Sequence, residues 1–171
     1  MRFIRNKNGF SLVEMVVYIA ILTLMSVYVV NSLTTLTRSY NDLRLAKNVN
    51  NSAAVALQRM VYEIRQASTV DSVNSTFGTS PGQLTLNTTD ASGNATTAQF
   101  FVLNGVLRVK MGGVDQGPIT QSNAVVTNLI FKQVQNSISK GIVITLGLQS
   151  SFGTKVRSET FYTTAVLRNI Y

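Results

Sequence analysis

The sequence predicts an α+β fold in which one long N-terminal helix packs on an antiparallel β-sheet. Residues 10–77 contain neither proline nor glycine, so no strong helix breaker interrupts them. Apolar residues recur there at steps of three and four, whereas beyond Ala98 they recur at steps of two. The length of 171 residues allows one domain of ordinary size with an attached helix.

The first part of the predicted helix is an apolar stretch from Gly9 to Leu33, and it contains a single carboxylate, Glu14. A charged side chain at the centre of a membrane helix costs on the order of 2.5 to 3.5 kcal/mol, so Glu14 needs a partner. No Lys or Arg lies between Lys7 and Arg38, so the stretch itself cannot provide a cation. Cleavage between Gly9 and Phe10 would create an α-amino group four residues before Glu14, on the same helical face.

The basic leader that ends in Gly9, followed by Phe10-Ser11-Leu12-Val13-Glu14 and an apolar run, resembles the N-terminus of type IV pilins and type II secretion pseudopilins. The resemblance implies that prepilin peptidase cleaves after Gly9 and N-methylates Phe10. It also implies that Glu14 makes an electrostatic contact with a pilin N-terminus during filament assembly. The implied partners are prepilin peptidase, other pilins or pseudopilins bound through the N-terminal helix, and the inner-membrane assembly machinery.

Two other interpretations of the stretch remain. A Sec signal peptide has an apolar core of about 7 to 15 residues followed by a cleavage site of small residues, and Val30-Asn31-Ser32 is a poor substitute for that site. A plain signal anchor would let Glu14 reach back to the membrane interface. We favour the prepilin interpretation because Gly9, Phe10 and Glu14 all fall at the required spacing. The leader contains Arg2, Arg5 and Lys7, so the positive-inside rule keeps it cytoplasmic and places the head outside the bacterial cytoplasmic membrane.

The second part of the helix is amphipathic, and we expect it to pack under the sheet. Its apolar stripe is broken only at the polar run 48–52, which we interpret as a frayed or bent point; the stripe comprises Leu33, Leu36, Tyr40, Leu43, Ala46, Ala53, Leu57, Met60, Ile64 and Ala67. The segment LQRMVYEIRQA, residues 57–67, resembles the end of the same helix in J-type minor pseudopilins and W-type minor pilins. The expected organisation is a leader at 1–9, a transmembrane and polymerisation helix at 10–35, and a pilin-like head at 36–171. Within that head we place helix at 36–67 and a β-rich region at 83–168.

The strands are predicted from period-two runs and turn signals. Asn104-Gly105 is a strong hairpin signal between the runs 98–103 and 106–111. Further strands are expected at 125–134, 142–148 and 160–167, and we expect Leu84 to Leu86 to form an edge strand. Their apolar face needs a cover, and the amphipathic part of the helix is available for it.

Composition argues against an enzyme. The chain has neither Cys nor His, which excludes thiol nucleophiles, the usual zinc sites and His-dependent triads. The seven carboxylates show no pairing, so we expect no catalytic residue, no metal and no cofactor. Asp90 to Asn94 offers one carboxylate where calcium loops use several, and we interpret it as a turn.

The expected function is that of a minor pilin or pseudopilin, a structural subunit of a type IV pilus-like or type II secretion filament. The formal charge of +8 falls to +5 once the three leader cations are removed, because 12 of the 15 basic side chains remain against 7 acidic ones. One alternative is a DNA-binding minor pilin of a competence-type uptake system, for which Arg108 and Lys110 on one hairpin face are the main local hint. We favour a solvated sheet face there, because the basic residues form no dense block. The other alternative is a signal-anchored extracytoplasmic domain without a filament role.

Overall fold

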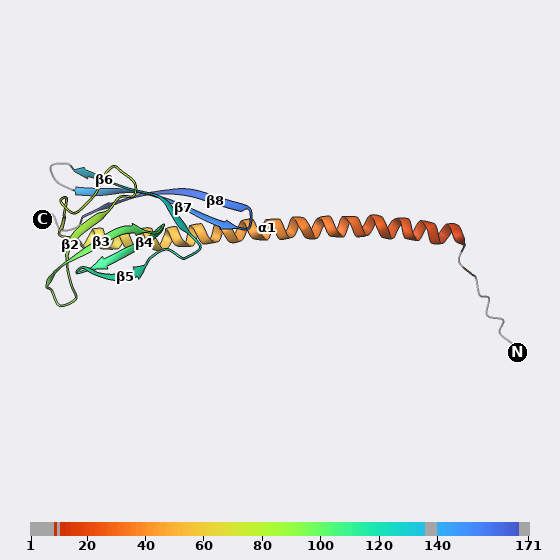
Figure 1. Cartoon of the computed structure of the whole chain (residues 1–171), viewed down its shortest axis with the longest axis horizontal. Helices are drawn as coiled ribbons and strands as arrows, with labels where there is room; N and C mark the ends of the chain where they lie inside the picture. The colour runs from red at the N-terminus through yellow and green to blue at the C-terminus, as the bar shows by residue number, and fades with distance from the viewer. Residues whose placement is uncertain (1–8, 10, 136–139, 168–171) are drawn as a thin grey trace. The chain divides into compact units, whose positions relative to one another are not determined.

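The computed structural model describes residues 9, 11–135 and 140–167, which form one helix and eight strands (Figure 1). The helix is α1 (Leu12–Gln66). The strands follow it in the order β1 (Thr69–Val70), β2 (Leu84–Thr89), β3 (Ala95–Leu103), β4 (Val106–Met111), β5 (Val114–Pro118), β6 (Val125–Gln135), β7 (Lys140–Phe152) and β8 (Lys155–Val166). The chain divides into two compact units, Met1–Asn41 and Asp42–Tyr171.

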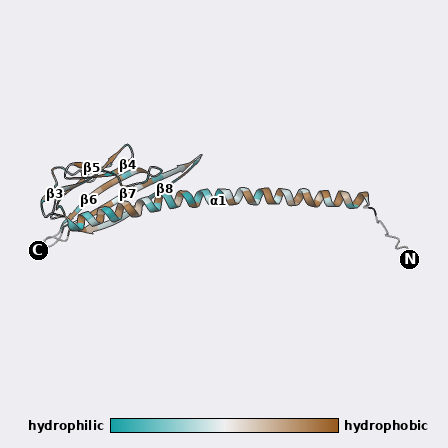
Figure 2. Cartoon of the chain, turned by 90° about the horizontal axis from the view of Figure 1, so that it is seen from below, coloured by the Kyte–Doolittle hydropathy of each residue, from teal (hydrophilic) through white to brown (hydrophobic). Residues whose placement is uncertain are grey.

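The part of α1 that belongs to the first unit is apolar along most of its length (Figure 2). It is long and apolar enough to cross a membrane, and none of its most apolar window is buried. Leu12 is 80 % exposed and Leu24 is 72 % exposed, so these side chains face outward without protein cover. Such a surface is stable in lipid or against other helices, which indicates that this part of α1 anchors the chain in a membrane.

In the second unit, α1 packs on two antiparallel sheets, which confirms the predicted α+β, pilin-like architecture of a helix on antiparallel strands. One sheet has five strands in the order β1-β2-β3-β4-β5, and the other has three in the order β6-β7-β8. The sequence pattern predicted one sheet. The chain forms two sheets instead. Strands that are neighbours in sequence pair with each other from β1 to β5 and again from β6 to β8, and the second sheet begins after the segment that joins β5 to β6.

A single apolar core joins the helix to both sheets. From α1 it contains Val49, Ala53, Ala56, Met60 and Ile64; from the larger sheet Leu84, Leu86, Phe100 and Leu107; and from the smaller sheet Leu129, Phe131, Ile142, Ile144, Leu146 and Leu148. All are at most 1 % exposed. Four of the six residues from the smaller sheet alternate along β7, as a strand with one buried face requires.

The buried face of α1 differs from the predicted stripe. Burial begins at Leu45, whereas Leu36, Tyr40 and Leu43 are 66 %, 69 % and 70 % exposed. The run 48–52, expected to fray or bend, is helical throughout, and its Val49 and Ser52 are buried. The prediction followed large apolar residues, but small residues form much of this contact because they let the helix approach the strands closely.

Most strands lie where the sequence pattern placed them. The hairpin of β3 and β4 turns at Asn104 and Gly105, whose φ angles of 53° and 74° are the left-handed pair that a two-residue turn needs. The expectation that Leu84 to Leu86 forms an edge strand was wrong, since β2 lies between β1 and β3. Strands β1 and β5 were not predicted, because one has two residues and the other is the polar, glycine-containing sequence VDQGP.

Candidate functional site

The candidate site is the start of α1, where the sequence predicted cleavage and an assembly contact. Gly9 is exposed, and a β-carbon built on it would meet nothing within 4 Å. Phe10 lies outside the described residues. The helix begins directly afterwards, with the Met15 amide donating to the Ser11 carbonyl oxygen at 3.1 Å. Gly9 is therefore an accessible position next to a regular helix.

Glu14 lies in the first turn of α1. An anionic side chain is favourable there because the helix dipole places partial positive charge at the N-terminal end. The Tyr18 hydroxyl donates to Glu14 Oε1 at 3.1 Å, one turn further on. Sequence reasoning missed Tyr18, although its spacing of four residues from Glu14 was the available signal.

Glu14 makes no ion pair with any residue that the structure describes. A phenol donor orients a carboxylate but leaves its charge in place, so Glu14 remains available to a cation from outside the described part of the chain. The predicted meeting of Glu14 with the Phe10 amine involves a residue outside the described range and stays a prediction.

The other polar side chains along this part of α1 are largely satisfied by their own helix. Thr23 donates to the carbonyl oxygens of Ile19 and Ala20, at 3.0 and 2.8 Å, and Ser26 donates to the Leu22 carbonyl oxygen at 2.8 Å. Such bonds remove the cost of placing a hydroxyl in an apolar environment. Glu14 is thus distinct among them, because it brings a full charge into the apolar segment.

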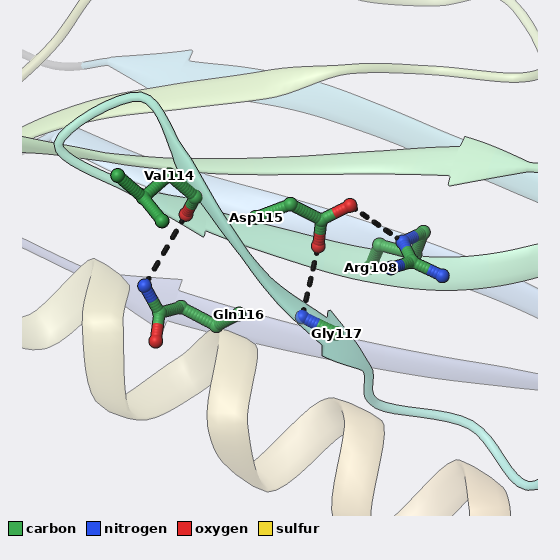
Figure 3. A network of polar contacts seen from close by, with 5 residues as sticks. All are labelled: Arg108, Val114, Asp115, Gln116 and Gly117. Carbon is green, nitrogen blue, oxygen red and sulfur yellow. Dashed lines mark hydrogen bonds and ion pairs between the residues drawn. The ribbon is translucent and has the colours of Figure 1, made fainter.

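The predicted basic feature of the head, Arg108 and Lys110 on β4, is engaged in internal contacts. Arg108 Nε donates to Asp115 Oδ2 at 2.8 Å, and the Gly117 amide donates to Asp115 Oδ1 at 2.8 Å (Figure 3). The Arg108 guanidinium, followed by the Gly117 amide, holds the pKa of Asp115 below its usual value, so this carboxylate is ionised at neutral pH. Lys110 Nζ lies 4.7 Å from the centroid of the Phe101 ring. The ion pair with Asp115 offsets the charge of Arg108 and so reduces the positive field that DNA binding would need.

The segment from Asp90 to Asn94 forms a turn between β2 and β3, as predicted. Asp90 Oδ1 accepts hydrogen bonds from the Ser92 and Asn94 amides at 2.9 and 2.8 Å. These amides, Asn94 first, lower the pKa of Asp90 below its usual value. Across residues 9, 11–135 and 140–167, no group of three or more Asp and Glu side chains gathers as a metal site would require.

Comparison with known families identifies the prokaryotic N-terminal methylation motif at residues 4–30. The match covers residues 4–9 of the leader and the first part of α1, including the positions of Gly9, Phe10 and Glu14, and it supports a pilin- or pseudopilin-type protein that is processed as a prepilin. The match does not extend to the segment 57–67, so it leaves the resemblance to J-type or W-type subunits untested. No curated protein and no solved structure matches this chain.

Proposed function

We propose that this chain is a minor pilin or pseudopilin, a non-catalytic structural subunit of a type IV pilus-like or type II secretion filament. The observation that supports this most directly is the methylation motif at residues 4–30, placed at the start of an exposed apolar helix. A monomer that leaves such a helix uncovered needs lipid first and other helices afterwards. A filament subunit stored in the membrane meets both requirements.

Maturation would create the group that the apolar segment lacks. Prepilin peptidase would cleave between Gly9 and Phe10 and methylate the new Phe10 amine, which remains cationic. Glu14 would then pair with that amine, in the same subunit or in a neighbour shifted along the filament axis. The pairing of opposite charges in a low-dielectric environment would set the axial register between subunits.

The domain organisation that goes with this proposal has three parts. Residues 1–9 form the leader, residues 10–35 the transmembrane and polymerisation helix, and residues 36–171 the head. The subunit would remain in the cytoplasmic membrane until the assembly machinery inserts it into a filament. The head would determine which neighbours the subunit accepts.

The test of this proposal is the N-terminus of the protein purified from its own cells. Mass spectrometry should find a wild-type chain that begins at Phe10 and carries one methyl group more than its sequence accounts for. The Gly9→Leu variant should keep its leader uncleaved. Asn6→Ser, a conservative change in the same leader, should be processed normally and is the matched control. An unprocessed wild-type N-terminus would overturn the proposal and favour a plain signal anchor.

A further inference from the structure

A cavity of about 630 Å³ lies at the C-terminal end of α1, away from the N-terminal motif. Its walls come from the last turns of the helix, from the end of β2, the start of β3 and the turn between them, and from the end of β4; the residues used below are Arg59, Tyr62, Glu63, Thr88, Asp90, Thr96 and Met111. This volume is within the range of small-ligand sites. None of the functions discussed above uses it.

The core-facing side of the larger sheet changes from apolar to polar at this cavity. The cross-strand pairs Leu84 with Phe100 and Leu86 with Ala98 belong to the core, and the next pair on the same face is Thr88 with Thr96. Thr88 is 6 % exposed as a residue, and its hydroxyl, which bonds to no described residue, is open to the cavity. A hydroxyl that opens onto a cavity and has no protein partner is available to a ligand.

Glu63 lies opposite this pair, on the core-facing side of α1 and only 4 % exposed. Arg59 Nη2 contacts Glu63 Oε1 at 2.7 Å, and Oε2, which bonds to no described residue, is open to the cavity. Arg59 is itself 45 % exposed, so it screens one side of the carboxylate only. A carboxylate oxygen that opens onto a cavity is an acceptor for the N–H donors of a cationic ligand.

The charges around the cavity favour a cation, although the protein as a whole is basic. The titratable groups that line it are Glu63 and Asp90, both acidic, together with Arg59 and Tyr62. The C-terminal end of α1 adds partial negative charge from its last carbonyls. Met111 and Tyr62 supply apolar surface beside these acceptors, so the walls combine anionic oxygens, hydroxyls and a strip that suits an alkyl chain.

We infer that this cavity binds a primary ammonium or guanidinium group at the end of an alkyl chain. The N–H donors of that group bond to Glu63 Oε2 and the Thr88 hydroxyl, and its alkyl chain lies along Met111 and Tyr62. The same chemistry occurs in small free amines and in Lys or Arg side chains of another protein.

The test is titration of the full-length, ¹⁵N-labelled chain in detergent micelles with butylamine, with butyrate as the probe of opposite charge. Butylamine should cause saturable amide shifts at Thr88, Thr89 and Asp90, and butyrate should cause none. Glu63→Gln should weaken the binding by about tenfold or more, because a hydrogen bond to a charged group is lost. Glu159→Gln, which changes a carboxylate paired with Arg157 on β8, should bind butylamine as the wild type does.

Two further measurements complete the test. Thr88→Val preserves the shape of the side chain and should also weaken binding, which keeps the inference testable if Glu63→Gln disturbs the fold. A capped tripeptide with a central Lys should compete with butylamine: tighter binding of the peptide identifies a protein side chain as the ligand, and tighter binding of the free amine identifies a small molecule. Absence of saturable shifts, or equal binding by Glu63→Gln and the wild type, would overturn the inference.

Discussion

Glu14 is the residue on which the proposed assembly mechanism depends. Its carboxylate accepts a hydrogen bond from Tyr18 and makes no ion pair with the described residues, so its charge is available to another subunit. Glu14→Gln keeps the size and hydrogen-bonding capacity of the side chain and removes the charge. We expect this variant to insert in the membrane normally but to be lost from sheared filaments, as measured by immunoblotting of membrane and filament fractions.

Two controls sharpen this experiment. Tyr18→Phe removes the hydroxyl donor but keeps the carboxylate charged, and we expect it to enter filaments because the charge makes the contact. Glu159→Gln changes a carboxylate on β8, outside the apolar segment, and should also leave incorporation unaffected. Wild-type levels of Glu14→Gln in filaments would refute the electrostatic role.

Asp115 offers a second prediction for a single residue. Arg108 and the Gly117 amide lower its pKa in the folded state, so its ionised form favours folding. That contribution is present above the unfolded-state pKa of about 3.9 and is lost as pH falls through the lower folded-state pKa. Arg108→Gln should raise the pKa of Asp115 toward its ordinary value, measurable by carboxyl ¹³C NMR titration, with Asp71 as an internal reference that should not move. An unchanged Asp115 titration would mean that Arg108 is not the main cause.

Among the elements, those with a strong local signal were predictable from sequence. Asn104-Gly105 defined the hairpin of β3 and β4, and the absence of breakers defined α1. The features that the sequence did not predict depend on tertiary contacts. Ser52 is buried on the core-facing side of α1, and its hydroxyl accepts a hydrogen bond from the Gln121 amide at 3.4 Å, a partner 69 residues away that periodicity does not reveal. β5 has no apolar alternation, and it pairs with β4 because the tight turn between them brings it there.

The buried face of α1 leads to a prediction about this helix as an element of the fold. Met60 is fully buried in the core between the two sheets, whereas Leu43 is 70 % exposed although the sequence pattern put both on one stripe. Met60→Ala should lower the free energy of unfolding by roughly 2–5 kcal/mol, from lost burial and the remaining cavity. Leu43→Ala should change it by less than about 0.5 kcal/mol. Denaturant titration of the full-length proteins in micelles, followed by circular dichroism, measures both, and equal effects would show that the assigned core face is wrong.

For the whole molecule, the two candidate sites differ in how far sequence alone could define them. Gly9, Phe10 and Glu14 are close in sequence, so a linear motif was enough to propose their roles. The cavity at the other end of α1 joins Glu63 to Thr88 and Thr96, which come from three different elements. Glu63 looked like half of an ordinary surface pair with Arg59, one helical turn away. Only the packing of β2 and β3 beneath the helix buries it and turns that pair into the wall of a cavity.

The distribution of charge over the whole chain predicts its orientation in the membrane. Arg2, Arg5 and Lys7 precede the apolar part of α1, and the positive-inside rule keeps such a leader in the cytoplasm. The chain has no cysteine, so single cysteines can be labelled without background. In spheroplasts that lack prepilin peptidase, a membrane-impermeant maleimide should label Ser72→Cys, an exposed position in the head, at once. Asn6→Cys in the retained leader should react only after permeabilisation, because the membrane separates the two positions. Labelling of Asn6→Cys in intact spheroplasts together with protection of Ser72→Cys would reverse the assigned orientation, and the proposed filament role would then lose its basis, since the head would be on the wrong side of the membrane.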